Sequence, residues 1–190
     1  MPVAEFRLRG KWGMSFDMFG WLKSLFGGEE PASPAREVTL TTLAPGDVVV
    51  HLDVTYMVEQ RITYHQSGFF WFDYRLDDGG GNTAWLSVTD DDELELAFFR
   101  PTSFQPNLPP PRQFEHEGVA YELDEHGVVD AKIDRGTGTE TRTRVEAWDY
   151  EGENGELLGI QRWGEGEIEV MLGRAVRPVE LDLLPGDGQR

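Results

Sequence analysis

The sequence predicts a mainly β protein, built as an antiparallel β-sandwich or barrel. Apolar and polar residues alternate in many short runs after residue 36, and turn signals rich in glycine and aspartate separate these runs. No helical pattern is interleaved between them, which argues against parallel strands joined by helices. Short strands connected in this way pair with their sequence neighbours in an antiparallel manner.

The clearest element is a β-hairpin over Phe69–Val88. Its side chains alternate before and after Asp77–Asn82, a turn that contains three consecutive glycines. The arms carry Trp71 and Trp85 among several other large aromatic residues. Burying one such side chain stabilises a fold by roughly 1.5–3 kcal/mol, so we expect a hydrophobic core here.

The hairpin is preceded by a turn at Pro45–Asp47 and by two strand patterns, and an acidic turn at Asp90–Glu93 leads into a further strand. The expected strands are Val48–Leu52, Tyr56–Tyr64 and Leu94–Phe98. Five prolines then fall within Pro101–Arg112. Because proline neither donates to a strand ladder nor continues a helix, this segment is expected to be an extended connection.

A second series of strands begins after Phe114. The patterns predict a hairpin that turns at Asp124–Gly127, followed by further strands; the expected strands are Val119–Leu123, Val129–Ile133, Arg142–Tyr150, Leu157–Trp163, Ile168–Leu172 and Val179–Leu183. Both series place a Trp/Tyr strand before an acidic, glycine-rich turn. We therefore expect one domain over residues 36–187, with related β-meander halves (38–100 and 113–184) joined by the proline-rich crossover.

Residues 1–35 are predicted to form a tail, a short amphipathic helix and a linker. Ser15 and Gly27 are suitable N-cap and C-cap residues for the helix. Its candidate docking residues for a partner protein or a membrane surface are Phe16, Met18, Phe19, Trp21, Leu22, Leu25 and Phe26. The alternative is that this apolar face packs on its own domain.

Composition excludes several classes of function. The net charge of −18, from 17 basic and 35 acidic residues, would repel the phosphate backbone of a nucleic acid. The absence of cysteine excludes disulfides, thiolate nucleophiles and cysteine-bound metals. No apolar run is long enough to span a bilayer, so we expect a cytoplasmic protein, peripheral to the inner membrane if the helix docks there.

No motif in the sequence predicts a catalytic residue, a metal site or a cofactor. The four histidines lack the spacing of a helical metal pair, and no serine lies in a nucleophile elbow. Asp77–Asn82 lacks the alternating ligands of a calcium loop. A glycosidase-type pair of carboxylates remains an alternative, because a sequence gives no distance between two acids.

The aromatic residues form the candidate ligand site. Either they fill a β core, or they line a concave site for a cationic ligand, which the acidic surface would favour. The residues in question are Trp71, Tyr74, Trp85, Trp148, Tyr150 and Trp163.

Several of these strand and turn patterns resemble a bacterial family, the domain of unknown function 4178. The resemblance spans roughly residues 43–184 and rests on Leu43-x-Pro-Gly-Asp47, Tyr56-x-Val58, Trp71-x-x-Tyr74, Trp85-Leu86-x-Val88, Tyr121-x-Leu123, Trp148-Asp-Tyr150 and Ile160-x-x-Trp163. It implies a non-catalytic module associated with membrane-stress or polyamine-related proteins, and it supplies no catalytic residue.

The expected function is therefore that of a non-enzymatic binding or adaptor module of a bacterial cytoplasm, recruited to a protein or a membrane by its N-terminal helix. One alternative is a binder of a small, polyamine-like cation. The other is an enzyme with an unrecognised carboxylate site, which would need a deep pocket holding two acids with perturbed pKa values.

Overall fold

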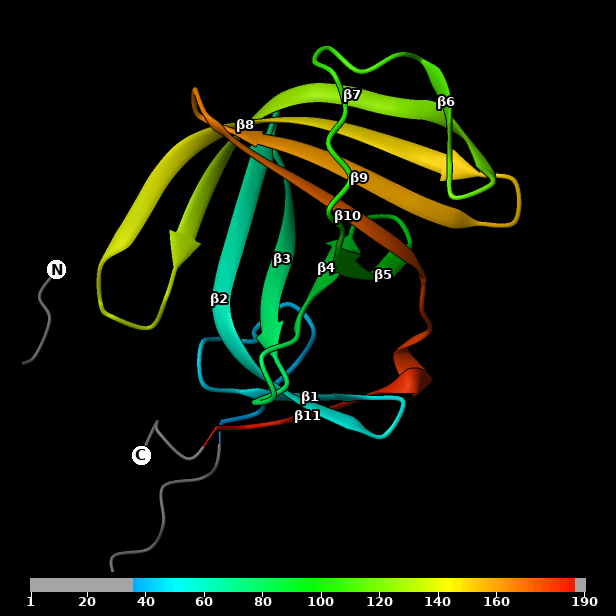
Figure 1. Cartoon of the computed structure of the whole chain (residues 1–190). Helices are drawn as coiled ribbons and strands as arrows, with labels where there is room; N and C mark the ends of the chain where they lie inside the picture. Colours follow the sequence, from blue (N-terminus) through cyan, green and yellow to red (C-terminus); the bar gives the residue numbers. More distant parts are fainter. Residues whose placement is uncertain (1–35, 187–190) are drawn as a thin grey trace, which may run out of the picture. The chain divides into compact units, whose positions relative to one another are not determined.

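Eleven antiparallel strands make up the chain in the computed structural model, which describes residues 36–186 (Figure 1). They are β1 (Val48–His51), β2 (Val54–Gln66), β3 (Phe69–Asp77), β4 (Thr83–Asp90), β5 (Leu94–Pro101), β6 (Gln113–His116), β7 (Val119–Asp134), β8 (Glu140–Gly152), β9 (Glu156–Trp163), β10 (Glu167–Ala175) and β11 (Leu181–Leu184). The predicted mainly β fold is confirmed. The helix expected at Ser15–Gly27 lies outside the described residues.

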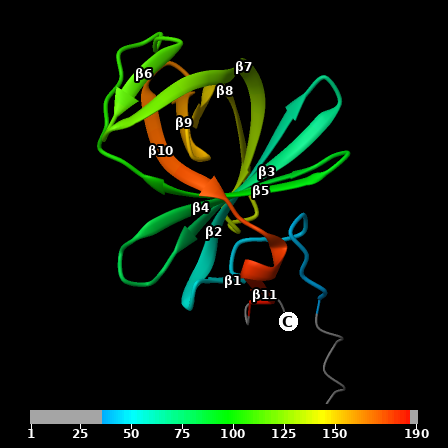
Figure 2. The ribbon, with the colours of Figure 1, turned by 90° about the vertical axis from the view of Figure 1, so that its right-hand side faces the viewer.

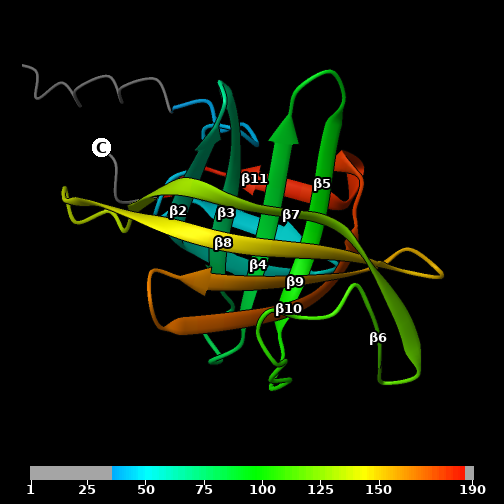
Figure 3. The ribbon, with the colours of Figure 1, turned by 90° about the horizontal axis from the view of Figure 1, so that it is seen from above.

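Eight of the strands close into a ring of hydrogen bonds. The order is β2-β3-β4-β5-β10-β9-β8-β7, and β7 pairs back onto β2 through Arg61–His65 and Asp130–Asp134. Each half of the chain contributes four consecutive strands to the ring. The first strands of the two groups, β2 and β7, pair with each other, and so do the last strands, β5 and β10. In Figure 3 the strands β7–β10 run across β2–β5.

The remaining strands extend the sheet beyond the ring. β1 pairs with β2 and carries β11 on its other edge, whereas β6 pairs with β7. They lie at opposite ends of the ring in Figure 2. Two-residue turns at Leu52–Asp53 and Glu117–Gly118, all with positive φ, connect β1 to β2 and β6 to β7, as expected for tight hairpins.

A β-bulge in each of the two ring-closing strands decides which side chains face inward. In β2 the register shifts between Val58 and Gln60, and in β7 it shifts between Leu123 and Glu125. An extra residue reverses the alternation of side chains. Tyr56 therefore packs outside the ring, whereas Ile62 of the same strand packs inside it.

Both outward faces of the ring are covered by other parts of the chain. The face of β2–β5 buries Tyr74 and Leu86 in one apolar cluster with Leu43, Val49 and Leu181. The face of β7–β10 forms a second cluster, which includes Trp148, Tyr150 and Ile160 and is covered by Phe104 and Leu108 of the proline-rich connection. Apolar burial is thus largely on the outside of the ring, which leaves its interior free to be polar.

Three sequence predictions for the second half were wrong in detail. Asp124–Gly127 is not a hairpin turn, because Glu125, His126 and Gly127 pair in register with β8 inside one continuous strand, β7. The polar, glycine-containing bulge imitates a turn signal. Val179, expected to begin the last strand, lies in a short 3-10 helix (Pro178–Glu180) that precedes β11. The strand β6 was not predicted, because its four residues alternate without a long apolar run. That the two halves are related stays a prediction.

Within the described residues no helix is long and apolar enough to cross a membrane.

Candidate functional site

The candidate site is a hollow inside the strand ring, with a cavity volume of about 890 Å³. All eight ring strands contribute to its lining. Its mouth lies where the β2–β3, β4–β5 and β8–β9 hairpins turn, since Phe69, Asp91 and Glu151 of these hairpin ends line it. Towards the opposite end the interior is filled by an apolar cluster that includes Ile62, Ile133, Val145 and Trp163.

Small side chains explain why the ring is not filled at this level. Each of five strands places a glycine or an alanine on the lining; these residues are Ala97, Gly127, Ala147, Gly159 and Ala175. A β-carbon added to Gly159 would meet nothing closer than 3.7 Å. Interiors of small strand rings are normally packed with side chains, so this space is a specific feature of the fold.

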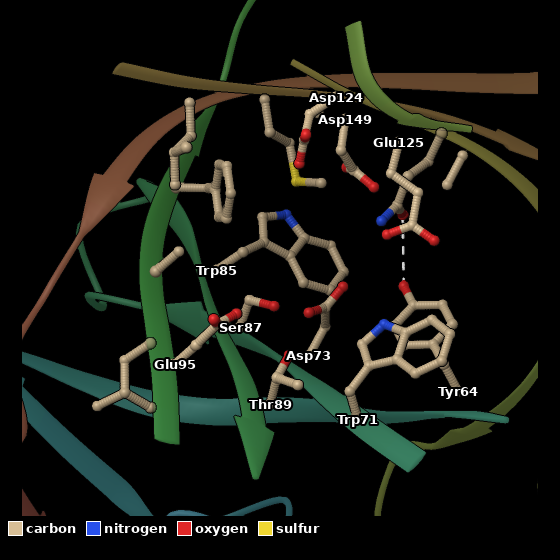
Figure 4. Close-up of a pocket in the computed structure, with 18 of the residues that line it drawn as sticks. Tyr64, Trp71, Asp73, Trp85, Ser87, Thr89, Glu95, Asp124, Glu125 and Asp149 are labelled. Carbon is tan, nitrogen blue, oxygen red and sulfur yellow. Dashed lines mark hydrogen bonds between the residues drawn. The ribbon is translucent and has the colours of Figure 1, made fainter. Parts of the chain in front are cut away.

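The lining of the hollow is acidic. Seven carboxyl side chains border it, and within the described part of the chain no lysine, arginine or histidine does; the seven are Asp73, Asp91, Glu95, Asp124, Glu125, Asp149 and Glu151. They come from both groups of strands, so the negative charge faces the cavity from opposite walls. Figure 4 shows Asp73 on one side of the Trp85 indole and Asp149 on the other.

Asp73 is the most enclosed of these acids, at 6% exposed. It points inward from β3 and is paired with Ser87 of β4. Burial raises the pKa of Asp73, and polar contacts with Ser87, Tyr64 and Gln161 oppose this rise only in part. The Tyr64 hydroxyl also donates to Gln161 Oε1 at 3.4 Å, so one short polar network links β2, β3, β4 and β9.

Asp149 lines the opposite wall of the ring. Its side chain is accessible to solvent from within the hollow. Enclosure by protein, and to a smaller extent the charges of Asp73, Glu125 and Asp124, raise the pKa of Asp149 to about 7. Its cross-strand partners are Glu125 and Gly159. Asp73 and Asp149 thus both have raised pKa values, as expected for enclosed carboxyl groups that lie among like charges.

Aromatic side chains supply the rest of the wall. Trp85, at 4% exposed, projects between the two acids, and Trp71 stacks on Tyr64 with ring centroids 5.3 Å apart. The face of an indole ring attracts ammonium groups and also accepts apolar chains. The hollow thus combines fixed negative charge with flat apolar surfaces.

The structure separates the six aromatic residues of the predicted ligand site. Trp71 and Trp85 lie on the wall of the hollow. Tyr74 and Trp148 lie in the two outer clusters, and Trp163 lies in the apolar end of the ring, where its Nε1 donates to Glu169 Oε2 at 3.0 Å. Tyr150 touches the lining, but its hydroxyl donates to the Pro111 carbonyl oxygen at 2.9 Å on the outside. The predicted docking residues Phe16–Phe26 lie outside the described residues.

Sequence reasoning missed the acids of the hollow. Asp73 and Asp149 each interrupt an aromatic strand, in Phe72-Asp73-Tyr74 and Trp148-Asp149-Tyr150. In both strands the aromatic neighbours face the outer clusters, so the aspartate faces the ring interior. The sequence signal for these acids was an aspartate between two aromatic residues in a strand. Because side chains alternate along a strand, the aspartate must face the side opposite to its aromatic neighbours.

Metal binding gains no support from the arrangement of acids. Across residues 36–186, no group of three His, Asp or Glu side chains is close enough to hold a metal ion. His126 stacks on Trp148 outside the ring and contacts Glu146 at 3.1 Å.

Comparison with known proteins identifies a family and no activity. The family model described as "Domain of unknown function (DUF4178)" matches residues 44–178. Uncharacterised proteins of Mycobacterium bovis and of two strains of Mycobacterium tuberculosis are 29% identical over 151 residues, which covers 75% of this chain and 72% of each relative. No solved structure matches the chain.

Proposed function

Because the chain belongs to this family, whose description assigns no activity, we propose a function from the site itself: a non-enzymatic module that binds an organic cation of the polyamine type in the hollow. The lining carries the proposal. Seven carboxyl groups face one cavity, with no basic side chain among the described residues to neutralise them. A cationic ligand would supply the missing counter-charge.

The electrostatics favour such a ligand at short and at long range. Two unit charges 4 Å apart attract by about 4 kcal/mol at an effective dielectric constant of 20. The net charge of −18 also raises the local concentration of cations around the protein. Asp73 and Asp149 come from opposite walls, so a ligand with two separated amino groups could pair with both.

The aromatic walls favour an organic cation over a metal ion. Trp71 and Trp85 offer indole faces to an ammonium group and to the methylene groups between two amines. The volume of about 890 Å³ falls in the range typical of small-molecule sites. A divalent metal would instead need converging oxygen ligands, which the described residues do not form.

Recruitment by the N-terminal helix is a separate part of the proposal. Its support is the amphipathic pattern of Phe16–Phe26 in the sequence, and the proposed location is the cytoplasm. Pull-down and vesicle sedimentation should be compared for the full chain and for a chain that begins at Arg36. Equal behaviour of the two would remove the helix from the account.

Isothermal titration calorimetry with spermidine at pH 8 tests the cation site. We expect saturable binding with a dissociation constant on the order of 1–100 µM, at least tenfold weaker in Asp73→Asn/Asp149→Asn. Glu165→Gln/Glu167→Gln is a matched control, because it also removes two acidic groups, from exposed positions at the β9–β10 turn outside the lining. Binding that is equal in Asp73→Asn/Asp149→Asn and in the control would refute the site.

One observation favours a second candidate function, acid–base catalysis. Asp73 and Asp149 both have raised pKa values and line the same cavity, which is a common property of catalytic carboxyl pairs. Incubation with chromogenic glycosides tests this candidate. Turnover by the wild-type protein that disappears in Asp149→Asn would support an enzyme. A wild-type protein that turns over none of these glycosides would favour binding alone.

A further inference from the structure

An exposed apolar rim continues from the hollow onto the tips of two hairpins. Phe69 and Phe70, at the start of β3, are 58% and 55% exposed, and Leu94, at the start of β5, is 42% exposed. All three also line the hollow. We call these three residues the rim.

The rim lies at the ends of the β2–β3 and β4–β5 hairpins, where each residue has a strand partner on one side only. Phe69 and Phe70 pair with β2 but lie past Trp71 and Thr89, the last pair of the β3–β4 ladder. Leu94 pairs with Asp90 of β4. Consecutive strand residues point to opposite faces, and both phenylalanines are exposed. The Phe70 ring packs on the His65 ring, with centroids 4.6 Å apart, and both phenylalanines remain more than half exposed.

The acidic residues next to the rim restrict which kind of molecule can cover it. Asp90–Glu93 form the turn directly before Leu94, and Asp91 and Glu95 face the hollow beside it. This cluster repels anionic lipid headgroups, so a bacterial membrane surface is a poor match. A molecule that is cationic at one end and apolar at the other satisfies both surfaces.

We infer that the ligand is an amphiphilic amine, with its charged amino groups among the acids of the hollow and a hydrocarbon tail on Phe69, Phe70 and Leu94. This inference rests on the proposed cation site, because the hollow would hold the amino groups. A polyamine without a tail would fill the acidic hollow and leave the rim in water. The tail is therefore the part of the ligand that the proposed function alone does not provide.

The test compares spermidine with its N1-octyl derivative, because the two carry the same amino groups and differ only in the tail. Burial of about two of the eight tail carbons against the rim would strengthen binding roughly tenfold. We expect that gain in the wild-type protein by calorimetry. The gain, taken as the ratio of the two affinities in the same protein, should be lost in Phe69→Ser/Phe70→Ser/Leu94→Ser.

A control variant keeps the comparison specific. Leu52→Ser/Val179→Ser removes two exposed apolar side chains that lie outside the lining, and it should retain the full gain. Circular dichroism establishes that each variant is folded. The comparison of the two ligands on the wild-type protein needs no variant. It therefore still tests the inference if the triple variant does not fold.

Three outcomes would overturn the inference. The first is a wild-type gain below about twofold, and the second is a gain that survives the triple variant. The third is sedimentation with phosphatidylcholine vesicles that depends on the rim, together with no gain from the tail, because the rim would then contact lipid. In each case unchanged spermidine binding would leave the proposed function intact, whereas failure to bind either amine would refute both.

Discussion

Asp149 of β8 is paired with Gly159 of β9, and a β-carbon on that glycine would lie 3.7 Å from Asp149 Oδ1. The Asp149 carboxyl group thus lies next to a strand position, Gly159, that has no side chain. Gly159→Leu should fill this space and lower the affinity for spermidine at least tenfold, while the free energy of unfolding falls by no more than about 1–3 kcal/mol, the usual cost of added side-chain atoms in an interior. Calorimetry and thermal unfolding check both. Gly166→Leu, in the open β9–β10 turn, is the control and should bind normally.

The second prediction concerns pH. Because enclosure raises the pKa of Asp149 from 3.8 to about 7, the folded protein holds more protons than the unfolded chain between these values. The contribution of Asp149 to the stability of the unliganded protein should therefore fall as pH rises from 4 to 7. Denaturant unfolding of the wild-type protein and of Asp149→Asn across this range measures the effect, and the variant should gain stability relative to the wild type as pH rises. A difference between the two proteins that does not change with pH would contradict the assignment.

Ligand binding should depend on pH in the opposite sense. A bound ammonium group favours the ionised form of Asp149, so spermidine affinity should increase as pH rises toward about 7 and protons should be released on binding. Calorimetry at pH 6.5 in two buffers of different ionisation enthalpy counts these protons. Asp149→Asn should release fewer of them.

Two tryptophans that are equally buried should differ in their response to ligand. Trp85 lies on the wall of the hollow at 4% exposed, and Trp148 lies in an outer cluster at 3% exposed. Spermidine should change the fluorescence of the wild-type protein and of Trp148→Phe. Trp85→Phe should lose most of the change. The reverse pattern would place the ligand outside the ring.

Asp47 should contribute to stability and not to binding. Burial raises the pKa of its carboxyl group, but hydrogen bonds from Arg36 and from the Gly186 and Ala44 amides outweigh this and lower it. The carboxylate thereby connects the segment before β1, through Arg36 and Ala44, with the residue Gly186 that follows β11. Asp47→Ala should cost about 2–4 kcal/mol of unfolding free energy, because it leaves buried N–H groups without acceptors. Calorimetric melting measures this cost, and spermidine affinity should stay unchanged.

Much of the fold could be predicted from the sequence because strand alternation and turn residues are local signals. The Phe69–Val88 hairpin and the strands after the proline-rich connection follow from them. The bulge at Asp124–Gly127 was mistaken for a turn, since one extra residue in a strand carries the same polar, glycine-containing signature. Ring closure could not be predicted, because the β2–β7 pairing joins residues far apart in the sequence.

The candidate site was predicted only in part for a related reason. Aromatic residues signalled a site or a core, and the structure assigns Trp71 and Trp85 to the hollow but Tyr74 and Trp148 to the outer clusters. The sequence does not say which face of a strand turns inward when both faces are buried. Asp73 and Asp149 come together only through closure of the ring.

A crystal structure of the protein grown with spermidine tests the central claim most directly. The account predicts electron density for the ligand inside the strand ring, between Asp73 and Asp149 and against the Trp85 indole. A saturated crystal in which spermidine lies on the outer surface, while the hollow contains only water, would contradict it.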